Sequence, residues 1–281
     1  MATLNSDYRP ICRRTAHSRI KLITELGEIY ENTNIFFREN IQYYKPFFSI
    51  MEDIVIPSNE EDYANKNRPR LLEKIPAILI KDLNESVSMK TTEVIEKHSE
   101  FYGFILEILS LPLNKVSDFR GIFLEDFVHY AGPSLPKKHD EYIKFMSPVI
   151  QVGTPLKKLK NKENDIDVIF VNVGENSEIL EVEAIECKSS INSFMYAVKR
   201  YVETETSNGK RDYNKVLYMK DVLEHSKADI PDCTIGFATY ESRFNIDYLI
   251  DIEEHYTHEI FEFIRKNTKI IERSQLLRLV M

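Results

Sequence analysis

The chain has 281 residues, of which 43% are hydrophobic and 29% are charged, and its formal net charge is −8 at pH 7. These proportions are typical of a soluble globular protein, and no apolar run is long enough for a membrane-spanning helix. Three cysteines without paired spacing fit a reducing cytosol better than a disulfide scaffold, and an N-terminus without an apolar signal core favours a cytoplasmic protein.

Residues 1–112 are expected to form a helical N-terminal region. Apolar residues recur at close to helical spacing over 15–45, and shorter helical patterns over 46–100 are interrupted by prolines. Another helix is predicted over 92–110. Since this region carries no catalytic constellation, we expect it to dock partner subunits or to regulate the rest of the chain.

Residues 113–281 are expected to form a mixed α/β domain. The predicted elements are, in chain order, a helix over 118–131 that Gly132-Pro133 ends, strands over 147–152, 164–171 and 180–188, helices over 190–206 and 213–225, a strand over 232–239 and a final helix over 246–266. The order of the core is therefore helix–strand–strand–strand–helix–strand.

Strands 164–171 and 180–188 are separated by eight residues rich in turn formers, which predicts a hairpin. The hairpin would bring Asp167 of the first strand close to Glu186 and Lys188 of the second. Successive side chains of a strand point to opposite faces, so Glu186 and Lys188 share a face. Two carboxylates and one ammonium group are the minimum set for metal-assisted phosphodiester hydrolysis.

At these residues the chain resembles the PD-(D/E)xK nuclease superfamily. The superfamily pattern has an Asp that opens one strand, Glu-x-Lys on the next strand and often a Glu on a preceding helix. The matching residues here are Asp167, Glu186, Lys188 and Glu125. The chain departs from the pattern at Ile166, where the family name has a proline. The resemblance covers residues 115–240 and implies a restriction-endonuclease-like αβββαβ core.

The resemblance also implies a set of roles. Asp167, Glu186, Glu125 and the carbonyl of Cys187 would bind Mg²⁺, or alternatively Mn²⁺, since hard cations prefer oxygen ligands. Lys188 would orient or deprotonate the attacking water, or stabilise the charge that develops on the phosphate. Burial beside a metal ion would lower the pKa of Lys188 and favour the base role.

Three acids near this pattern have alternative interpretations. Asp165 points the same way as Asp167, but Asp167 directly precedes the apolar run of the strand. Asp126 lies about 100° around the helix from Glu125, nearer the edge of the face. Glu183 is expected to face solvent or to contact a core helix, without a catalytic role.

The negative net charge opposes DNA binding by the chain alone, because nucleic-acid-binding surfaces are usually basic. Basic clusters at residues 9–21 and 157–162 reduce this conflict, although both also fit solvated loops. The second cluster directly precedes the Asp167 strand. The candidate nucleic-acid contacts are Lys157, Lys158, Lys160, Lys199 and Tyr201. For Lys199 and Tyr201 the favoured alternative is a helix that packs on the sheet.

The sequence gives weaker support for a zinc site, a cysteine nucleophile or a nucleotide-binding loop. His255 and His258 are one helical turn apart but have no nearby cysteine to complete a zinc site. Cys187 lacks a neighbouring His–Asp pair that would activate a thiolate. The eight glycines form neither a P-loop nor a dinucleotide-binding fingerprint, so no ATP motor is expected.

The expected protein is a cytoplasmic, Mg²⁺-dependent endodeoxyribonuclease, a hydrolase that cuts DNA with the help of partner proteins. We expect it to act as the effector subunit of a prokaryotic defence or restriction system, including antiviral defence, with a homodimer as one possible assembly. One rival is a catalytically inactive nuclease-fold scaffold in a DNA-processing complex. Another is a wholly helical regulatory protein in which the hairpin is incidental.

Overall fold

A computed structural model describes residues 8–12, 16–57, 59–83, 91–134, 142–152, 157–158, 165–176, 178–205, 207, 209–230, 232–245 and 259–280. Internal contacts divide the chain into two units. The sheet unit comprises residues 1–15 and 124–276, and the helical unit comprises residues 16–123 and 277–281. The expected boundary was between residues 112 and 113. The observed division instead falls after Phe123, inside a helix, and assigns the first residues of the chain to the sheet unit.

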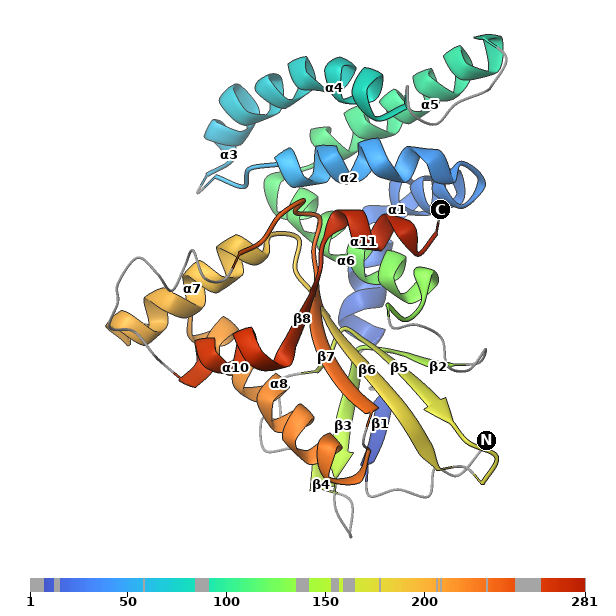
Figure 1. Ribbon diagram of the computed structural model, residues 1–281. Coiled ribbons are helices and arrows are strands. Elements are labelled where there is room, and N and C mark those ends of the chain that lie inside the picture. The colour runs from blue at the N-terminus through green and yellow to red at the C-terminus, as the bar shows by residue number, and fades with distance from the viewer. Residues whose placement is uncertain are drawn as a thin grey trace. The chain divides into compact units, whose positions relative to one another are not determined.

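The helical unit confirms the predicted helices of the N-terminal region (Figure 1). Its elements are α1 (Ala16–Glu39), η1 (Ile41–Tyr43), α2 (Tyr44–Asp53), α3 (Glu60–Asp62), η2 (Tyr63–Asn67), α4 (Arg68–Leu83), α5 (Thr91–Ser110) and the first part of α6 (Leu113–Ala131). Helix α1 is kinked at Gly27, whose φ of 57° lies in the region that favours glycine. Helix α6 begins five residues before the predicted start at 118.

Aromatic rings form the core of the helical unit. The ring of Phe37 lies 4.5 Å from that of Phe47 and 4.9 Å from that of Tyr44, measured between centroids, and all three side chains are buried. Aromatic pairs add about 0.5–1.5 kcal/mol beyond the burial of their area. Some buried polar groups here bond within their own helix, as Thr33 does to the carbonyl of Ile29 at 2.6 Å, whereas the buried Asp82 of α4 accepts a hydrogen bond of 2.6 Å from the hydroxyl of Ser49 of α2.

The described residues of the sheet unit form two sheets (Figure 1). The first has the order β1 (Tyr8–Cys12), β3 (Pro148–Val152) and β4 (Lys157–Lys158). The second has the order β2 (Ile143–Met146), β5 (Val168–Val173), β6 (Ile179–Cys187), β7 (Asp232–Ala238) and β8 (Thr268–Ile271). In the second sheet β2, β5 and β6 are antiparallel neighbours, whereas β6, β7 and β8 run parallel. The mixed α/β class is therefore confirmed, and the wholly helical alternative is wrong.

Helices α7 (Ile191–Thr204), α8 (Lys210–Asp229) and α10 (Glu259–Asn267) lie on one side of the five-stranded sheet (Figure 1). Their apolar faces share one core with Val182 and Ala184 of β6 and with Ile235 of β7. Ser190 caps α7 by accepting a hydrogen bond from the Ser193 backbone N–H. A short helix, α11 (Arg273–Arg278), follows β8.

The two hairpin strands and the helices and parallel strand that follow them match the sequence prediction, whereas several other elements differ. The strands predicted at 147–152, 164–171, 180–188 and 232–239 correspond to β3, β5, β6 and β7. Strand β1 lies in the region expected to be helical, and β2, β8 and α11 were not predicted. Residues 246–258 of the predicted final helix lie outside the described residues, and α10 covers its end. In the described ranges, no helix has both the length and the hydropathy to span a bilayer.

Candidate functional site

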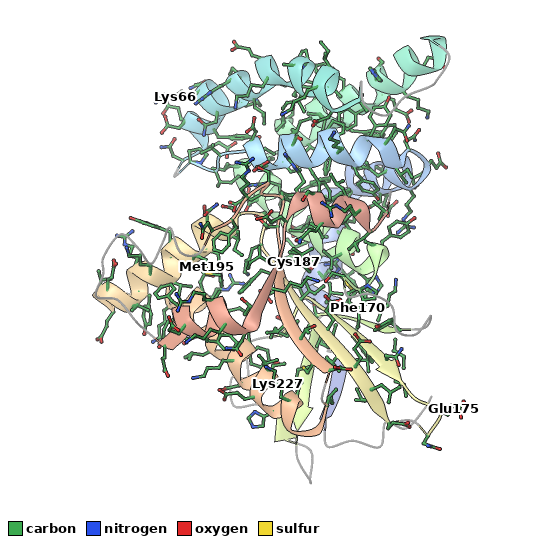
Figure 2. All side chains as sticks on the ribbon, in the orientation of Figure 1. Lys66, Phe170, Glu175, Cys187, Met195 and Lys227 are labelled. Carbon is green, nitrogen blue, oxygen red and sulfur yellow. The ribbon has the colours of Figure 1, made fainter. Side chains whose placement is uncertain are left out.

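The β5–β6 hairpin brings the two predicted carboxylates to neighbouring positions. Val168 pairs with Ile185 across the hairpin, so Asp167, one residue before β5, meets Glu186 one position further along β6. Oδ2 of Asp167 accepts a hydrogen bond of 2.7 Å from the backbone N–H of Cys187. Figure 2 labels Cys187 at the end of β6, and this end of the strand is the candidate site.

Glu186 is the most buried charge of the site, with 1% of its surface exposed. Its Oε1 lies 2.8 Å from Nζ of Lys188 and 3.1 Å from Nζ of Lys215. Its Oε2 is also buried and has no hydrogen-bond partner among the described residues. Burial alone would raise the pKa of Glu186, but the two ammonium groups outweigh burial and hold the pKa below its ordinary value.

Asp167 is affected in the opposite direction. Burial, together with repulsion from the Glu186 carboxylate, raises the pKa of Asp167 to about 7, although Lys215 and Lys188 act against the shift. Two carboxylates that share one site favour a state in which one of them holds a proton. In the metal-free site the negative charge therefore resides mainly on Glu186 at neutral pH.

Lys188 lies at the end of β6, where its backbone N–H donates to the carbonyl of Ala238 at 2.8 Å. Its Nζ sits 4.9 Å from the centroid of the Phe194 ring, and 23% of its side chain is exposed. Burial would lower the pKa of Lys188, but the carboxylates of Glu186 and Asp167 raise it above its ordinary value. In the metal-free site Lys188 is therefore an ammonium group at neutral pH. The lowered pKa expected beside a bound metal ion stays a prediction.

Lys215 of α8 is a member of this cluster that sequence reasoning missed. Besides its contact with Glu186, its Nζ donates to the backbone carbonyl of Asp165 at 2.7 Å and lies 3.5 Å from Oδ1 of Asp165. One sequence signal was available. Lys215 precedes the buried Met219 and Val222 by four and seven residues, so it falls on the apolar stripe of its own helix.

Glu125, on the part of α6 that belongs to the sheet unit, acts on the same end of β6. Burial first, and then the charges of Asp167, Glu125 and Glu186, raise the pKa of the Cys187 thiol well above its ordinary value. The thiol is therefore protonated at neutral pH, which argues against a thiolate nucleophile. Cys187 is also buried, with 8% of its surface exposed.

Over the described ranges, no group of three or more His, Cys, Asp and Glu side chains is close enough to hold a metal ion. Glu125 as a third carboxylate ligand therefore stays a prediction. Asp167 and Glu186 by themselves still fit Mg²⁺, because this ion is usually held by one or two carboxylates, with waters and substrate phosphates as its other ligands. The buried, unpartnered Oε2 of Glu186 is the observation that supports such a fit.

The structure separates Asp167 from its competitor Asp165. Asp167 bonds to β6, whereas Asp165 contacts Lys215 of α8. Glu183 is 2% exposed and its carboxylate accepts hydrogen bonds from the backbone N–H, at 2.7 Å, and the hydroxyl of Ser134. The solvent-facing interpretation of Glu183 is therefore wrong.

Two of the candidate nucleic-acid contacts, Lys199 and Tyr201, have partners on α7 and α8. Lys199 pairs with Glu203 of the same helix at 3.4 Å, and the ring of Tyr201 packs 4.9 Å from that of Tyr213. The backbones of Lys157 and Lys158 form β4, next to β3. Lys160, His255 and His258 lie outside the described residues.

The structure thus brings together Asp167, Glu186 and Lys188 as predicted and adds Lys215. A comparison of the chain with protein-family models, with curated proteins and with solved structures finds no match.

Proposed function

We propose that this protein is a metal-dependent endonuclease that hydrolyses DNA phosphodiester bonds with a PD-(D/E)xK-type site on a restriction-endonuclease-like core. One observation carries the proposal. Asp167 and Glu186 adjoin each other on neighbouring strands, with Lys188 at 2.8 Å from Glu186 and one carboxylate oxygen of Glu186 left without a partner. Buried charges with shifted pKa values concentrate at functional sites more than elsewhere.

Asp167 and Glu186 would hold Mg²⁺ or Mn²⁺, together with the backbone carbonyl of Cys187. A bound ion would supply a Lewis acid for the phosphate and a water of lowered pKa. Glu125 on α6 would add negative charge near these ligands, because its charge already acts on Cys187.

Lys188 would stabilise the negative charge that develops on the scissile phosphate. It is a charged ammonium at neutral pH, and its partial exposure leaves it able to meet a substrate from solvent. Its contact with the Phe194 ring and its ion pair with Glu186 restrict where the ammonium can lie, which favours a fixed orientation toward the substrate. A bound cation would favour the ionised form of Asp167, whose pKa burial and the Glu186 carboxylate raise to about 7 in the metal-free site.

Nicking of supercoiled plasmid DNA with Mg²⁺, with Mn²⁺ and with a chelator tests the proposal. We expect metal-dependent cleavage that falls at least about 100-fold in Asp167→Asn and in Lys188→Met, the size of a lost transition-state contact. These variants retain the size of the side chains and keep the rest of the buried cluster. Glu224→Gln and Lys227→Met, which change exposed residues of α8 by the same charges, are the matched controls and should cleave like the wild type.

Full activity in Asp167→Asn would show that cleavage does not take place at Asp167 and its neighbours. Absence of cleavage of double-stranded and single-stranded DNA by the wild type with either metal would remove the function itself.

A non-catalytic scaffold is the second candidate, and one observation favours it. Two lysines already neutralise Glu186, so the cluster is electrostatically satisfied without a metal ion. Titration of the wild type with Mn²⁺ separates the two candidates, because a scaffold needs no ion and should leave the free Mn²⁺ concentration unchanged.

A further inference from the structure

Lys215 makes contacts on both sides of the proposed metal site. Its Nζ lies 3.1 Å from Oε1 of Glu186 and donates to the carbonyl of Asp165 at 2.7 Å. We infer that Lys215 is a positioning residue of the proposed nuclease, one that holds the segment leading to Asp167 in place against Glu186. The inference rests on the proposed function and deepens it.

Bonds and contacts link Asp165, Asp167, Glu186 and Lys215 in a ring around the proposed metal site. Asp165 leads through Ile166 to Asp167, whose carboxylate is held by the N–H of Cys187, and Cys187 directly follows Glu186. Lys215 joins the two ends of this path, from Glu186 back to the Asp165 carbonyl. Asp167 precedes the first paired residue of β5, so β5–β6 pairing alone does not hold it. Two backbone hydrogen bonds also hold the segment, from the Ile166 N–H to the Pro148 carbonyl at 3.3 Å and from the Ser147 N–H to the Asp167 carbonyl at 2.8 Å. Lys215 adds the constraint that ties the segment to Glu186.

The backbone that carries Lys215 is fixed in position, because α8 begins in close contact with α7. Gly209, just before α8, has a φ of +86°, and a Cβ there would collide with the carbonyl oxygen of Ala197. The Tyr213 N–H donates to the Gly209 carbonyl at 2.9 Å and so closes the first turn. A helix start pinned in this way fixes the direction from which Lys215 approaches the site.

A lysine at this place is costly for a purely structural role. Lys215 is 8% exposed and stands on the helix stripe that otherwise packs into the core. A buried ion pair is often no more stabilising than apolar residues of similar volume. The charge of Lys215 is therefore better explained by the positions in which it holds Asp167 and Glu186.

Lys215→Met retains the length of the side chain and removes its charge and its donors. The site then becomes more negative, so binding of Mn²⁺ should be unchanged or tighter. Release of the segment at Asp165 should instead slow cleavage, because misplacing a reacting group by a small distance lowers the rate of the chemical step. A residue that only stabilised the fold would weaken both properties together.

The experiment compares the full-length wild type, Lys215→Met, Lys215→Arg and the matched control Lys227→Met. Free Mn²⁺ is measured by electron paramagnetic resonance, and single-turnover plasmid cleavage is measured at saturating Mn²⁺. We expect Lys215→Met to cleave at least about tenfold more slowly with an equal or lower Mn²⁺ dissociation constant. Lys215→Arg, which keeps the charge and the donors, should stay within about threefold of the wild type, and Lys227→Met should match the wild type.

Wild-type cleavage by Lys215→Met at saturating Mn²⁺ overturns the inference but leaves the proposed function standing. A parallel loss of Mn²⁺ binding and cleavage makes Lys215 a stabilising residue and also overturns the inference. If Lys215→Met does not fold, Lys215→Gln takes its place, and if neither folds the role is structural and the inference falls. A wild type that neither binds Mn²⁺ nor cleaves DNA overturns the proposed function, and the inference with it.

Discussion

The helical unit and the sheet unit treat buried polar groups differently. In the helical unit the core is built from stacked and edge-on aromatic rings, polar side chains such as Thr33 bond back to their own helix, and the buried Asp82 of α4 accepts a hydrogen bond from the neutral hydroxyl of Ser49 of α2. In the sheet unit the buried charges Glu186 and Lys215 have opposite signs and pair with each other across separate elements. Because buried ion pairs are a weak source of stability, the contrast teaches that the charges of the sheet unit are better evidence of function than of folding.

The largest expected effect is on the aromatic core. Phe47→Ala removes a fully buried ring that lies 4.5 Å from the ring of Phe37 and 4.6 Å from that of Phe123. We expect the free energy of unfolding to fall by about 3–5 kcal/mol, as for other buried Phe→Ala changes. Urea unfolding followed by circular dichroism measures this loss. A fall below about 1 kcal/mol would mean that the rings are not the main support of this unit.

The next effect tests whether the buried charges support the fold. Glu186→Leu leaves Lys215 without its carboxylate, and we expect a loss of about 3 kcal/mol in the free energy of unfolding. In the double variant Glu186→Leu with Lys215→Met, no unpaired buried ammonium is left at Lys215, so most of that loss should be recovered. Nicking activity should remain absent in both. A double variant as unstable as the single one would show that the charges are needed for stability, and the comparison between the units would fail.

A smaller effect is the change in folding stability with pH that Asp167 causes in the sheet unit. The folded-state pKa of Asp167, about 7, lies above the ordinary value of 3.8, so the folded protein holds this proton more tightly than the unfolded chain. The resulting stability is complete below about pH 4 and is lost as the pH rises toward 7. Asp167→Asn should reduce this pH dependence. Thermal unfolding of the metal-free protein from pH 5 to pH 8 checks it, and identical profiles for the two proteins would contradict the shift.

The smallest effect is the pH dependence of stability that His98 causes in the helical unit, and its sign is opposite to that of Asp167. Burial lowers the pKa of His98 below 6.5, and its Nδ1 lies 2.6 Å from the hydroxyl of Tyr43. The unfolded chain therefore takes up a proton more readily, and stability present above pH 6.5 is lost as the pH falls through the folded-state pKa. His98→Gln should weaken this loss. Amide hydrogen exchange of α2 and α5 at two pH values can detect it, and a stability that rises on acidification in this unit would refute the sign.

The hairpin and its acids were predictable because the information is local. Asp167 and Glu186 are brought together by two apolar strands and a short turn, and the period of two places Glu186 and Lys188 on one face. The capped helix after the hairpin was predictable for the same reason, since Ser190 and the stripe of Ile191, Phe194 and Val198 lie within one segment.

Other features depend on partners distant in the chain. Strand β1 is formed by pairing with β3, and its own five residues carry no clear alternation. Lys215 contacts Glu186 only because α8 packs against the five-stranded sheet. The direction of the Lys188 pKa shift depends on how two carboxylates balance the burial of its side chain. The burial of Glu183 likewise depends on Ser134. Such contacts are set by tertiary packing, which single-segment patterns do not contain.

The change from antiparallel to parallel pairing at β6 has a consequence for the order of folding. Antiparallel β5 and β6 can pair through a short turn, whereas parallel β7 needs the crossover that contains α7 and α8. Since local pairings form first, we expect the hairpin to assemble before α8 delivers Lys215, so that Asp167 and Glu186 meet with only Lys188 as a counterion. Mild acid or Mn²⁺ should then speed refolding. Pulse-labelled hydrogen exchange should show protection of β5 and β6 before α8, and earlier protection of α8 would reverse the proposed order.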